Sequence, residues 1–228
     1  MKNFLIIIKN KNQFLKGENM LHDLDVYWIG GSPCSGKSTL AEKLEKDFNM
    51  DYYKIDDYLE RFMEEGAKKN IKILKMFHEM NLDETWLRDV QTQVIDEFDF
   101  YRQTFQFIKK EIIENYNGRP MITEGAALLP ELMDKHEIPD SRYICITPTE
   151  EFQLKHFKKR TWVDYYLSDC SDPEKAFDNW MKRDIKFAKF VKKEAKKRNK
   201  NYIEMDGSEL VGKTYNKIKN IFKLKELK

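Results

Sequence analysis

A run of glycine and hydroxyl residues between two hydrophobic stretches carries the most specific chemical signal in the sequence. The run GGSPCSGKST covers residues 30–39, and residues 31–38 fit the spacing G-x-x-x-x-G-K-[ST] without a mismatch. Glycines permit a tight wrap that turns successive backbone N–H groups toward one point, where they bind phosphate oxygens. The apolar residues 25–29 before the run predict a strand, and residues 38–48 after it predict an amphipathic helix.

The residues of this glycine loop (residues 31–38) have different expected roles. The Lys37 ammonium is expected to reach the β- and γ-phosphates of a nucleoside triphosphate, and the Ser38 hydroxyl to ligate Mg²⁺. The predicted nucleotide contacts are Gly31, Ser32, Pro33, Cys34, Ser35, Gly36, Lys37, Ser38 and Thr39. Cys34 is either a redox-sensitive thiol at a helix start or a small residue that fills the loop, and the second is favoured. A plain glycine-rich turn is the structural alternative for the whole loop.

Carboxylates follow two of the other predicted strands. Asp56 and Asp57 come directly after residues 52–55, and Glu124 comes after residues 120–123 and before a glycine. Because the carboxyl ends of parallel strands meet at one edge of a sheet, these acids are expected beside the glycine loop. We favour Asp56 over Asp57 as the catalytic base or as a ligand in the metal shell, and Glu124 is the second candidate base. Capping of the next helix by the aspartates is the structural alternative.

Length and composition bound the class of protein. The 228 residues are 41% hydrophobic, 13% aromatic and 35% charged, which is typical of one globular domain with a polar surface. The 41 basic and 39 acidic residues nearly balance, so net charge gives no reason to expect nucleic acid or an anionic membrane. Three widely spaced cysteines indicate neither a disulfide framework nor a zinc site, and no apolar run reaches the roughly 20 residues of a membrane span. We expect a cytoplasmic monomer.

Short strands and helical segments alternate along most of the chain. Further strands are predicted at residues 142–146 and 201–205, whereas residues 57–118 carry helical apolar spacing without a good strand. Alternation predicts a mostly parallel sheet that is covered on both faces and binds ligands beyond its carboxyl edge. We interpret residues 57–118 as a helical, acceptor-binding insertion in a single domain over residues 20–228.

Residues 1–19 are predicted to be an N-terminal extension. Residues 16–19, KGEN, can be encoded by bases that contain a ribosome-binding sequence shortly before the codon for Met20. The extension is therefore either a product of an upstream start or a genuine part of the protein, and both interpretations stay open.

Together these motifs resemble the nucleoside-monophosphate-kinase-like group of P-loop kinases, which includes shikimate and gluconate kinases, chloramphenicol phosphotransferases and zeta-type toxins. The similar features are GGSPCSGKST, Asp56 after the second strand, and ITEG at residues 122–125. The combination of GGSPCSGKST with the stretch YYKIDDYL, residues 52–59, is similar to that of uncharacterised bacterial members of the group. The resemblance implies a three-layer α/β/α P-loop NTPase fold, with a five-stranded parallel sheet in the order 2-3-1-4-5, a helical insertion and a lid at residues 158–183.

The resemblance implies further site residues. Arg160, at the end of a predicted helix, and Arg183 resemble lid arginines, whose guanidinium groups stabilise the charge of a transferring phosphate. Ordinary solvated helix charges are the alternative for both. Gly207, in the stretch MDGS after the fifth strand, resembles the loop that borders the adenine base. The insertion also holds residues that would line an acceptor pocket but are more often core, namely Trp86, Arg88, Tyr101, Arg102 and Phe105.

We therefore predict an enzyme, an ATP-dependent and Mg²⁺-requiring kinase that transfers the γ-phosphate to a hydroxyl or phosphate of an unidentified small molecule. A nucleotide-sensing protein and a kinase or NTPase acting on nucleic acid ends are the alternatives. The basic run at residues 182–200 would serve the last, but helical spacing puts Phe187, Phe190 and Val191 on a buried side and the lysines on a solvated face. The choice between ATP and GTP stays open.

Overall fold

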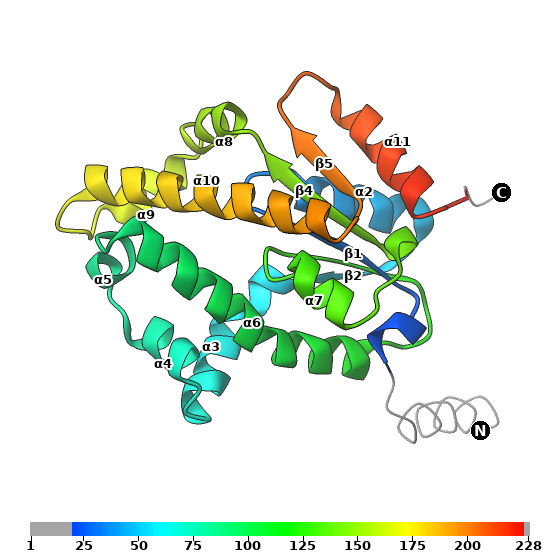
Figure 1. Ribbon diagram of the computed structural model, residues 1–228, viewed down its shortest axis with the longest axis horizontal. Helices are drawn as coiled ribbons and strands as arrows, with labels where there is room; N and C mark the ends of the chain where they lie inside the picture. The colour runs from blue at the N-terminus through cyan, green and yellow to red at the C-terminus, as the bar shows by residue number, and fades with distance from the viewer. Residues whose placement is uncertain (1–19, 226–228) are drawn as a thin grey trace.

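The computed structural model describes residues 20–225, and a five-stranded parallel sheet forms its centre (Figure 1). The strands are β1 (Val26–Gly31), β2 (Asp51–Lys54), β3 (Met121–Glu124), β4 (Tyr143–Pro148) and β5 (Tyr202–Met205). They lie in the order β2-β3-β1-β4-β5, and each neighbouring pair is parallel. The α/β class and the order 2-3-1-4-5 are confirmed. The predicted extension, residues 1–19, lies outside the described residues.

Helices cover both faces of the sheet. One face carries α2 (Lys37–Phe48) and α11 (Val211–Ile221). The other carries α6 (Val90–Asn115), α7 (Pro130–Lys135) and α10 (Pro173–Lys197). Figure 1 shows α7 and α10 in front of the sheet and α2 behind it. The chain therefore forms the three layers that were predicted.

The alternation of side chains along β4 shows how one strand supplies both cores. Tyr143 and Cys145 are buried in the core that includes α6 and α10, whereas Ile144 and Ile146 are buried in the core under α2 and α11. Successive residues of a strand point to opposite faces, so a strand covered on both faces is apolar throughout. This explains why β4 reads as a continuous hydrophobic run.

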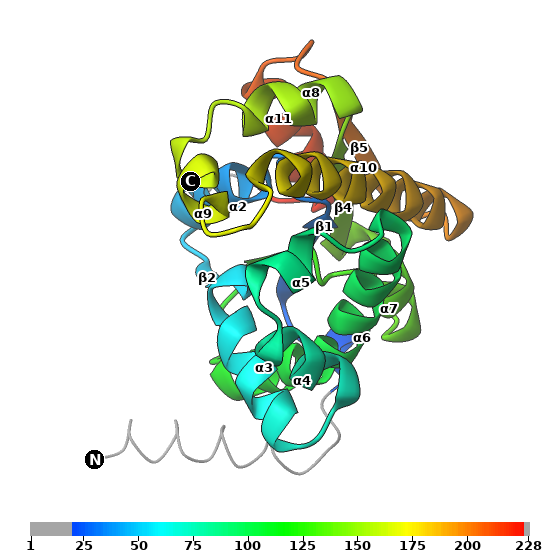
Figure 2. The ribbon, with the colours of Figure 1, turned by 90° about the vertical axis from the view of Figure 1, so that its left-hand side faces the viewer.

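Four helices connect β2 to β3 after a short 3₁₀ turn, η2 (Ile55–Tyr58). They are α3 (Leu59–Lys68), α4 (Lys72–Glu79), α5 (Leu82–Trp86) and α6. Figure 2 shows them together on the lower side of the molecule. Asp89 separates α5 from α6, because its side chain caps the new helix by accepting a hydrogen bond of 2.9 Å from the Thr92 N–H. The apolar spacing alone did not reveal this break.

Two short helices, α8 (Glu150–Phe157) and α9 (Thr161–Leu167), lie between β4 and α10. Figure 2 shows them on the opposite side of the molecule from α3 and α4. Their buried side chains Phe157, Val163 and Leu167 pack with Trp86 of α5 and Trp180 of α10. This apolar contact joins the segment 158–183, the expected lid, to α5 in the middle of the insertion.

Several predicted boundaries and placements were wrong in detail. β1 runs on through Gly30 and Gly31, which pair with Cys145 and Ile146 of β4. The predicted helix before Arg160 ends at Phe157, and Arg160 is the N-cap residue of α9. Phe190 is 40% exposed and covers Phe98 of α6 at the surface, because α10 passes the edge of the core there.

The remaining described elements are the short 3₁₀ turns η1 (Leu21–Asp23) and η3 (Asp140–Arg142). Across residues 20–225, none of the helices combines the length and the apolar character needed to cross a membrane.

Candidate functional site

The glycine loop joins the end of β1 to the start of α2. Gly36 is the N-cap residue of α2 with a left-handed backbone (φ 80°), and a Cβ atom added there would meet nothing within 4 Å. Gly31 has φ 125°, and a Cβ atom added to it would lie 1.8 Å from the Ile146 carbonyl oxygen. Only glycine fits position 31, and no side chain caps the start of α2, so its first N–H groups are left for an anion.

Lys37 lies at the first turn of α2 and is 6% exposed. Its ammonium donates to the Ser32 carbonyl oxygen at 2.8 Å, and the Ser35 hydroxyl donates to the same oxygen at 2.9 Å. Within residues 20–225, no carboxylate lies within ion-pair distance of this ammonium. A buried cation without an acid partner is costly in free energy, so this position favours a bound anion.

Glu124 ends β3, which lies between β1 and β2 in the sheet. Its Oε1 atom accepts hydrogen bonds from the Ser38 hydroxyl at 2.9 Å and from the Tyr52 hydroxyl at 3.1 Å. Its Oε2 atom is buried and has no hydrogen-bond partner in the described part of the chain. The sheet order therefore brings an acid from β3 to the hydroxyl of the glycine loop, as the sequence predicted.

Burial raises the pKa of Glu124, and the charge of Asp56 adds to the increase, whereas Lys37, Ser38 and Tyr52 oppose it. Burial, followed by the charge of Glu124, likewise raises the pKa of the Tyr52 hydroxyl. Tyr52 was missed as a site residue. The sequence signal for Tyr52 is its position two residues before Lys54 on β2. Lys54 pairs with Glu124, and residues two apart in a strand point to the same face, so Tyr52 lies on the same side of the sheet as Glu124.

Asp56 and Asp57 differ in their surroundings. Asp57 forms an ion pair of 3.1 Å with Lys54, whereas no ion pair or hydrogen bond joins the Asp56 carboxylate to any residue from 20 to 225. A Cβ atom added to Gly125 would lie 3.3 Å from Asp56 Oδ1, so this carboxylate stands directly beside the end of β3. Neither acid caps α3, whose N-cap residue Tyr58 makes no side-chain cap. The geometry favours Asp56, and the helix-capping alternative was wrong.

Arg160 stands at the start of α9. Its guanidinium carbon lies 4.6 Å from the centre of the Phe157 ring and 5.8 Å from that of Trp162. The positive charge of Arg160 opposes the increase that burial causes in the pKa of Cys34, so the arginine lies close to the glycine loop. It forms no ion pair with an acid in the described chain, which leaves its guanidinium available to an anion.

Arg183 has a different environment from Arg160. It is buried on α10, where its Nε atom lies 3.2 Å from Glu97 Oε2 of α6 and its Nη2 atom donates to Asp184 Oδ1 at 2.6 Å. Its guanidinium carbon also lies 4.7 Å from the centre of the Trp86 ring. The structure therefore brings Arg183 to the site, but with its charge committed to two carboxylates.

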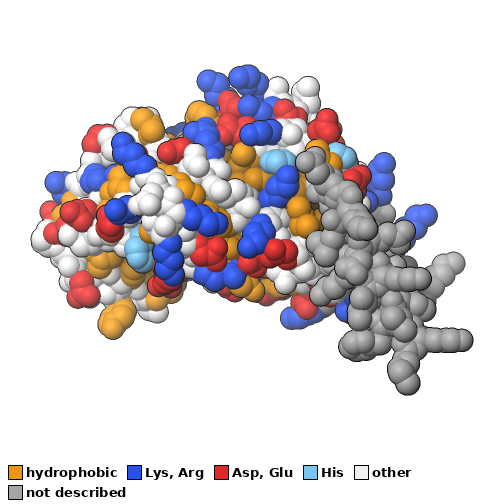
Figure 3. All heavy atoms as spheres, turned by 90° about the horizontal axis from the view of Figure 1, so that it is seen from below, with side chains coloured by type: hydrophobic (Ala, Val, Ile, Leu, Met, Phe, Trp, Pro, Cys, Tyr) orange, Lys and Arg blue, Asp and Glu red, His pale blue; other side chains and the backbone are white. Residues whose placement is uncertain are grey.

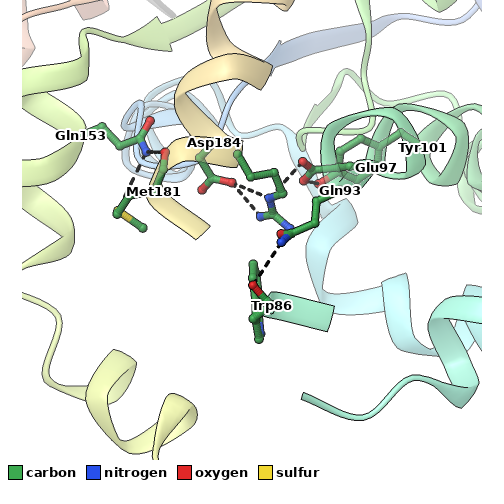
Figure 4. A network of polar contacts seen from close by, with 8 residues as sticks. Trp86, Gln93, Glu97, Tyr101, Gln153, Met181 and Asp184 are labelled. Carbon is green, nitrogen blue, oxygen red and sulfur yellow. Dashed lines mark hydrogen bonds and ion pairs between the residues drawn. The ribbon is translucent and has the colours of Figure 1, made fainter. Parts of the chain in front are cut away.

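The acids around Arg183 form an unexpected part of the site, shown in Figure 4. Burial raises the pKa of Glu97 to about 7, although the charge of Arg183 opposes the increase. The Tyr101 hydroxyl donates to Glu97 Oε1 at 3.2 Å. Sequence reasoning missed Glu97. The available signal was its spacing of four residues from Gln93 and from Tyr101, which puts three polar groups on a buried stripe of α6.

Cys34 occupies a left-handed position in the glycine loop (φ 62°) and packs against the apolar residues of α9 and α10. Burial raises the pKa of its thiol, and the charge of Asp184 adds to the increase. A thiol with a raised pKa is poorly reactive, which favours the interpretation of Cys34 as a loop-filling residue.

The other predicted nucleotide contacts are spread around the loop. Ser32 is fully buried, Pro33 is half-buried, and Thr39 is exposed on the first turn of α2. Gly207 lies after β5 with φ 82°, and a Cβ atom added to it would come within 3.2 Å of the Phe152 ring. It borders a hollow of about 590 Å³ between β5 and α11, and no residue of the glycine loop lines that hollow.

The aromatic residues and arginines of the insertion are mostly committed to the interior. Trp86, Tyr101 and Phe105 are each at least nine-tenths buried. Arg88 pairs with Asp96 at 2.5 Å, and Arg102 pairs with Glu131 at 2.6 Å. The core alternative therefore describes most of this set, although Tyr101 also contacts Glu97 and Trp86 contacts Arg183.

No protein-family model matches the chain, and no curated protein matches it. Among solved structures it is similar to an uncharacterized protein from Eubacterium ventriosum, with 17% identity over 87% of this chain and 97% of the other and a TM-score of 0.40. It is also similar to a shikimate kinase from Aquifex aeolicus, with 16% identity over 85% of this chain and 92% of the other and a TM-score of 0.35. Likenesses this distant assign no activity.

Proposed function

We propose that this protein is an ATP-dependent kinase that transfers a phosphoryl group to the hydroxyl of a small acceptor. The observation that carries the proposal is the buried Lys37 ammonium, which forms no ion pair with an acid within residues 20–225 and lies in the first turn of α2, where no side chain caps the helix. A buried cation beside a cradle of backbone donors is suited to a polyphosphate. Asp56 and Glu124 at the neighbouring strand ends supply the acids that the transfer needs.

In the proposed reaction, the acceptor hydroxyl oxygen forms a bond to the γ-phosphorus of ATP. The bond between that phosphorus and the oxygen shared with the β-phosphate breaks, and ADP leaves with the electron pair. The hydroxyl proton passes to the Asp56 carboxylate, which is exposed and can return it to water. Glu124, which already accepts two hydrogen bonds, orients Ser38 and stays in place.

The residues beside the loop fit a magnesium ion. The free Oε2 of Glu124 is a buried acceptor, and the Ser38 hydroxyl lies 2.9 Å from the other oxygen of the same carboxylate. Within residues 20–225, no group of three or more His, Cys, Asp or Glu side chains could hold a metal alone. This agrees with Mg²⁺, which usually takes one or two protein oxygens together with phosphates and water. Ser38 and Glu124 are the residues that would hold the ion, which would neutralise phosphate charge, while Asp56, the other acid considered for the metal shell, is proposed as the base.

Arg160 is the proposed arginine over the transferring phosphate. Its guanidinium is free of acids and is held against Phe157 and Trp162 at the lid. Arg183 is proposed to position α10 against α6, because releasing it would leave two buried carboxylates without a counter-ion.

The test is a screen of fractionated metabolites with γ-labelled ATP and Mg²⁺, in which acceptor-dependent release of ADP and transfer of label are both measured. The wild-type protein is expected to label at least one fraction, and Lys37→Ala is expected to label none. A protein that binds MgATP but never releases ADP in an acceptor-dependent manner would instead be a nucleotide sensor, and the kinase proposal would fail.

A further inference from the structure

Two buried carboxylates share one guanidinium between α6 and α10. Glu97 is 5% exposed and Asp184 is 0% exposed, and both approach Arg183 within 3.2 Å. Other than Arg183, no cation in the described chain forms an ion pair with either acid. With both acids ionised, the cluster carries one negative charge more than its own cation balances. Because an uncompensated buried charge is costly, the cluster favours a second cationic partner.

Two oxygen atoms in this cluster, Gln93 Oε1 and Asp184 Oδ2, have neither a hydrogen bond nor an ion pair among the described residues, whereas Glu97 Oε2 lies 3.2 Å from Arg183 Nε. Figure 4 shows Gln93 and Glu97 projecting from α6 toward Asp184 on α10. Gln93 is independent evidence for a missing hydrogen-bond donor, because it is neutral and 2% exposed. Its amide nitrogen already donates to the Trp86 and Arg88 carbonyl oxygens, so only its oxygen lacks a partner. Two unpartnered buried acceptors beside an excess of carboxylate charge match a group that donates several N–H bonds, such as an ammonium.

The cluster lies next to the groups proposed for the chemistry. The Tyr101 hydroxyl donates to Glu97 Oε1 at 3.2 Å, and burial, with the charges of Glu97 and then Asp56 adding to it, raises the pKa of that hydroxyl, so Tyr101 lies within electrostatic reach of both acids. On the other side, the charge of Asp184 acts on Cys34 of the glycine loop. A small molecule that reached both Asp56 and this cluster would hold its hydroxyl near the transferred phosphate.

Aromatic rings stand beside the cluster and continue to the surface. The rings of Trp86 and Trp180 are stacked with centres 4.5 Å apart, and Tyr166 packs edge-on against both. Trp162 is 50% exposed and Tyr166 is 41% exposed. Faces of indole and phenol rings attract cations, so this wall suits the approach of a positively charged group.

The same region lacks what an anionic acceptor requires. Binding of a carboxylate or phosphate acceptor usually uses an arginine with free donors. The four arginines from residues 55–120 are all paired with acids, as Arg61–Glu111, Arg88–Asp96, Arg102–Glu131 and Arg119–Asp51. Only Arg160 is free among the arginines near the site, and it lies at the lid over the loop.

We propose that the acceptor is a cation, an amino alcohol or aminated sugar whose ammonium group binds Glu97, Asp184 and Gln93 while its hydroxyl faces Asp56. This inference rests on the proposed kinase function. The ammonium supplies the charge that Arg183 alone does not balance and donates to the two unpartnered oxygens, Gln93 Oε1 and Asp184 Oδ2.

The test uses probes that differ in charge but carry similar hydroxyl groups. One set is ethanolamine, ethylene glycol and glycolate, and the other is glucosamine, glucose and gluconate. Release of ADP from MgATP gives kcat/KM for each probe, and calorimetry gives its binding without turnover. We expect the amine of each set to exceed its neutral and anionic partners by at least about tenfold in kcat/KM, which corresponds to one favourable charge contact.

Glu97→Gln and Asp184→Asn test the cluster itself, because each removes one charge and leaves a balanced pair with Arg183. Both variants are expected to lose the preference for amines and to keep MgATP affinity. Glu131→Gln is the matched control, because it removes an acid whose partner, Arg102, lies outside the cluster, and it should keep the preference.

The outcomes separate the two proposals. Preference for the neutral or anionic probes, or an unchanged amine preference in Glu97→Gln, overturns the inference while the kinase function stands. Binding of the amines without ADP release from any probe supports the cation site and contradicts the kinase function. Failure of every amine to bind, with or without MgATP, overturns the inference and identifies the cluster as a structural link between α6 and α10.

Discussion

At the scale of single residues, substitution of the buried Lys37 is expected to affect nucleotide binding and protein stability differently. We predict that Lys37→Ala lowers the affinity for MgATP by at least about a hundredfold, because the phosphates lose a charge-assisted donor. The free energy of unfolding without nucleotide should not fall, since the variant removes a buried charge that has no acid partner. Calorimetry measures the first quantity and chemical denaturation the second.

Lys43→Ala is the matched control for that prediction. Lys43 lies on the same helix but is exposed and pairs with Asp47. The Lys43→Ala substitution should change neither the MgATP affinity nor the free energy of unfolding by more than the small amount typical of a surface ion pair. Equal losses of MgATP affinity in the two variants would remove Lys37 from its proposed role.

Asp56 and Asp57 allow a test between neighbouring carboxylates. Asp56→Ala is expected to keep MgATP affinity and to lower kcat by about 10²-fold or more, which is the typical contribution of a positioned base. Asp57→Ala removes only the exposed pair with Lys54 and should keep most activity. Single-turnover kinetics with an accepted substrate measure the transfer step directly. A reversed order of the two variants would assign the base to Asp57.

The sequence predicted the positions of those proposed site residues that depend on local spacing. Lys37 and Ser38 belong to one continuous loop, and Asp56 and Glu124 follow predicted strands, so their places depend only on strand order. Tyr52, Gln93 and Glu97 escaped notice because their roles come from contacts across the fold. Glu97 meets Arg183 only when α6 and α10 pack side by side. Apolar spacing says which face of a helix is buried, but not which partner covers it.

At the scale of elements, the close pairing of β1 with β4 limits the glycine loop. Gly31→Ala would put a Cβ atom 1.8 Å from the Ile146 carbonyl oxygen at a φ of 125°, so strand and loop would have to separate. We predict that this variant costs more than about 3 kcal/mol in the free energy of unfolding, from overpacking and backbone strain together. Urea denaturation followed by circular dichroism measures the loss.

Gly212→Ala is the control for this prediction. It lies in α11, and a Cβ atom added there would meet nothing within 4 Å. Because alanine favours a helix over glycine, this variant should be neutral or more stable by up to about 1 kcal/mol. A Gly31→Ala protein as stable as Gly212→Ala would mean that β1 and β4 can move apart at little cost.

The order of the strands could be predicted from the motif resemblance, whereas several element ends could not. β1 extends through Gly31 because β4 pairs with it, and that pairing is a tertiary contact that no local pattern contains. The end of α8 at Phe157 and the new start at Arg160 are likewise set by packing of Phe157 against Trp180. Local spacing gives the type of an element more reliably than its ends.

At the scale of the whole molecule, acidic and basic groups are interspersed. Figure 3 shows Lys and Arg side chains mixed with Asp and Glu over the face that it presents. Lysines of α10 that were considered for nucleic acid form ion pairs, as in Lys182–Asp178, Lys189–Glu150 and Lys192–Glu204. Paired lysines contribute little to binding a polyanion, which argues against the nucleic-acid alternative.

The pH dependence of global stability gives a test of the buried acids that does not depend on any substrate. Burial raises the pKa of Glu97 to about 7, so the folded state holds this proton at pH values where the unfolded chain has lost it. A raised carboxyl pKa favours the folded state at low pH, and its contribution declines as pH rises from about 4.5 to about 7. Histidines with lowered pKa values, such as His136, act in the opposite direction near pH 6.5, so a variant is needed to isolate Glu97.

We therefore predict the difference in unfolding free energy between Glu97→Gln and the wild-type protein at several pH values. Between pH 4.5 and pH 7.5, the unfolding free energy of the variant should rise relative to that of the wild-type protein by on the order of 1–3 kcal/mol, because glutamine has no proton to lose. Urea denaturation at fixed ionic strength measures the difference, and Glu131→Gln, whose acid is partly exposed, should show no such gain. A constant difference across this range would mean that Glu97 ionises as an ordinary carboxyl group, and the excess negative charge beside Arg183 would then cost the fold nothing.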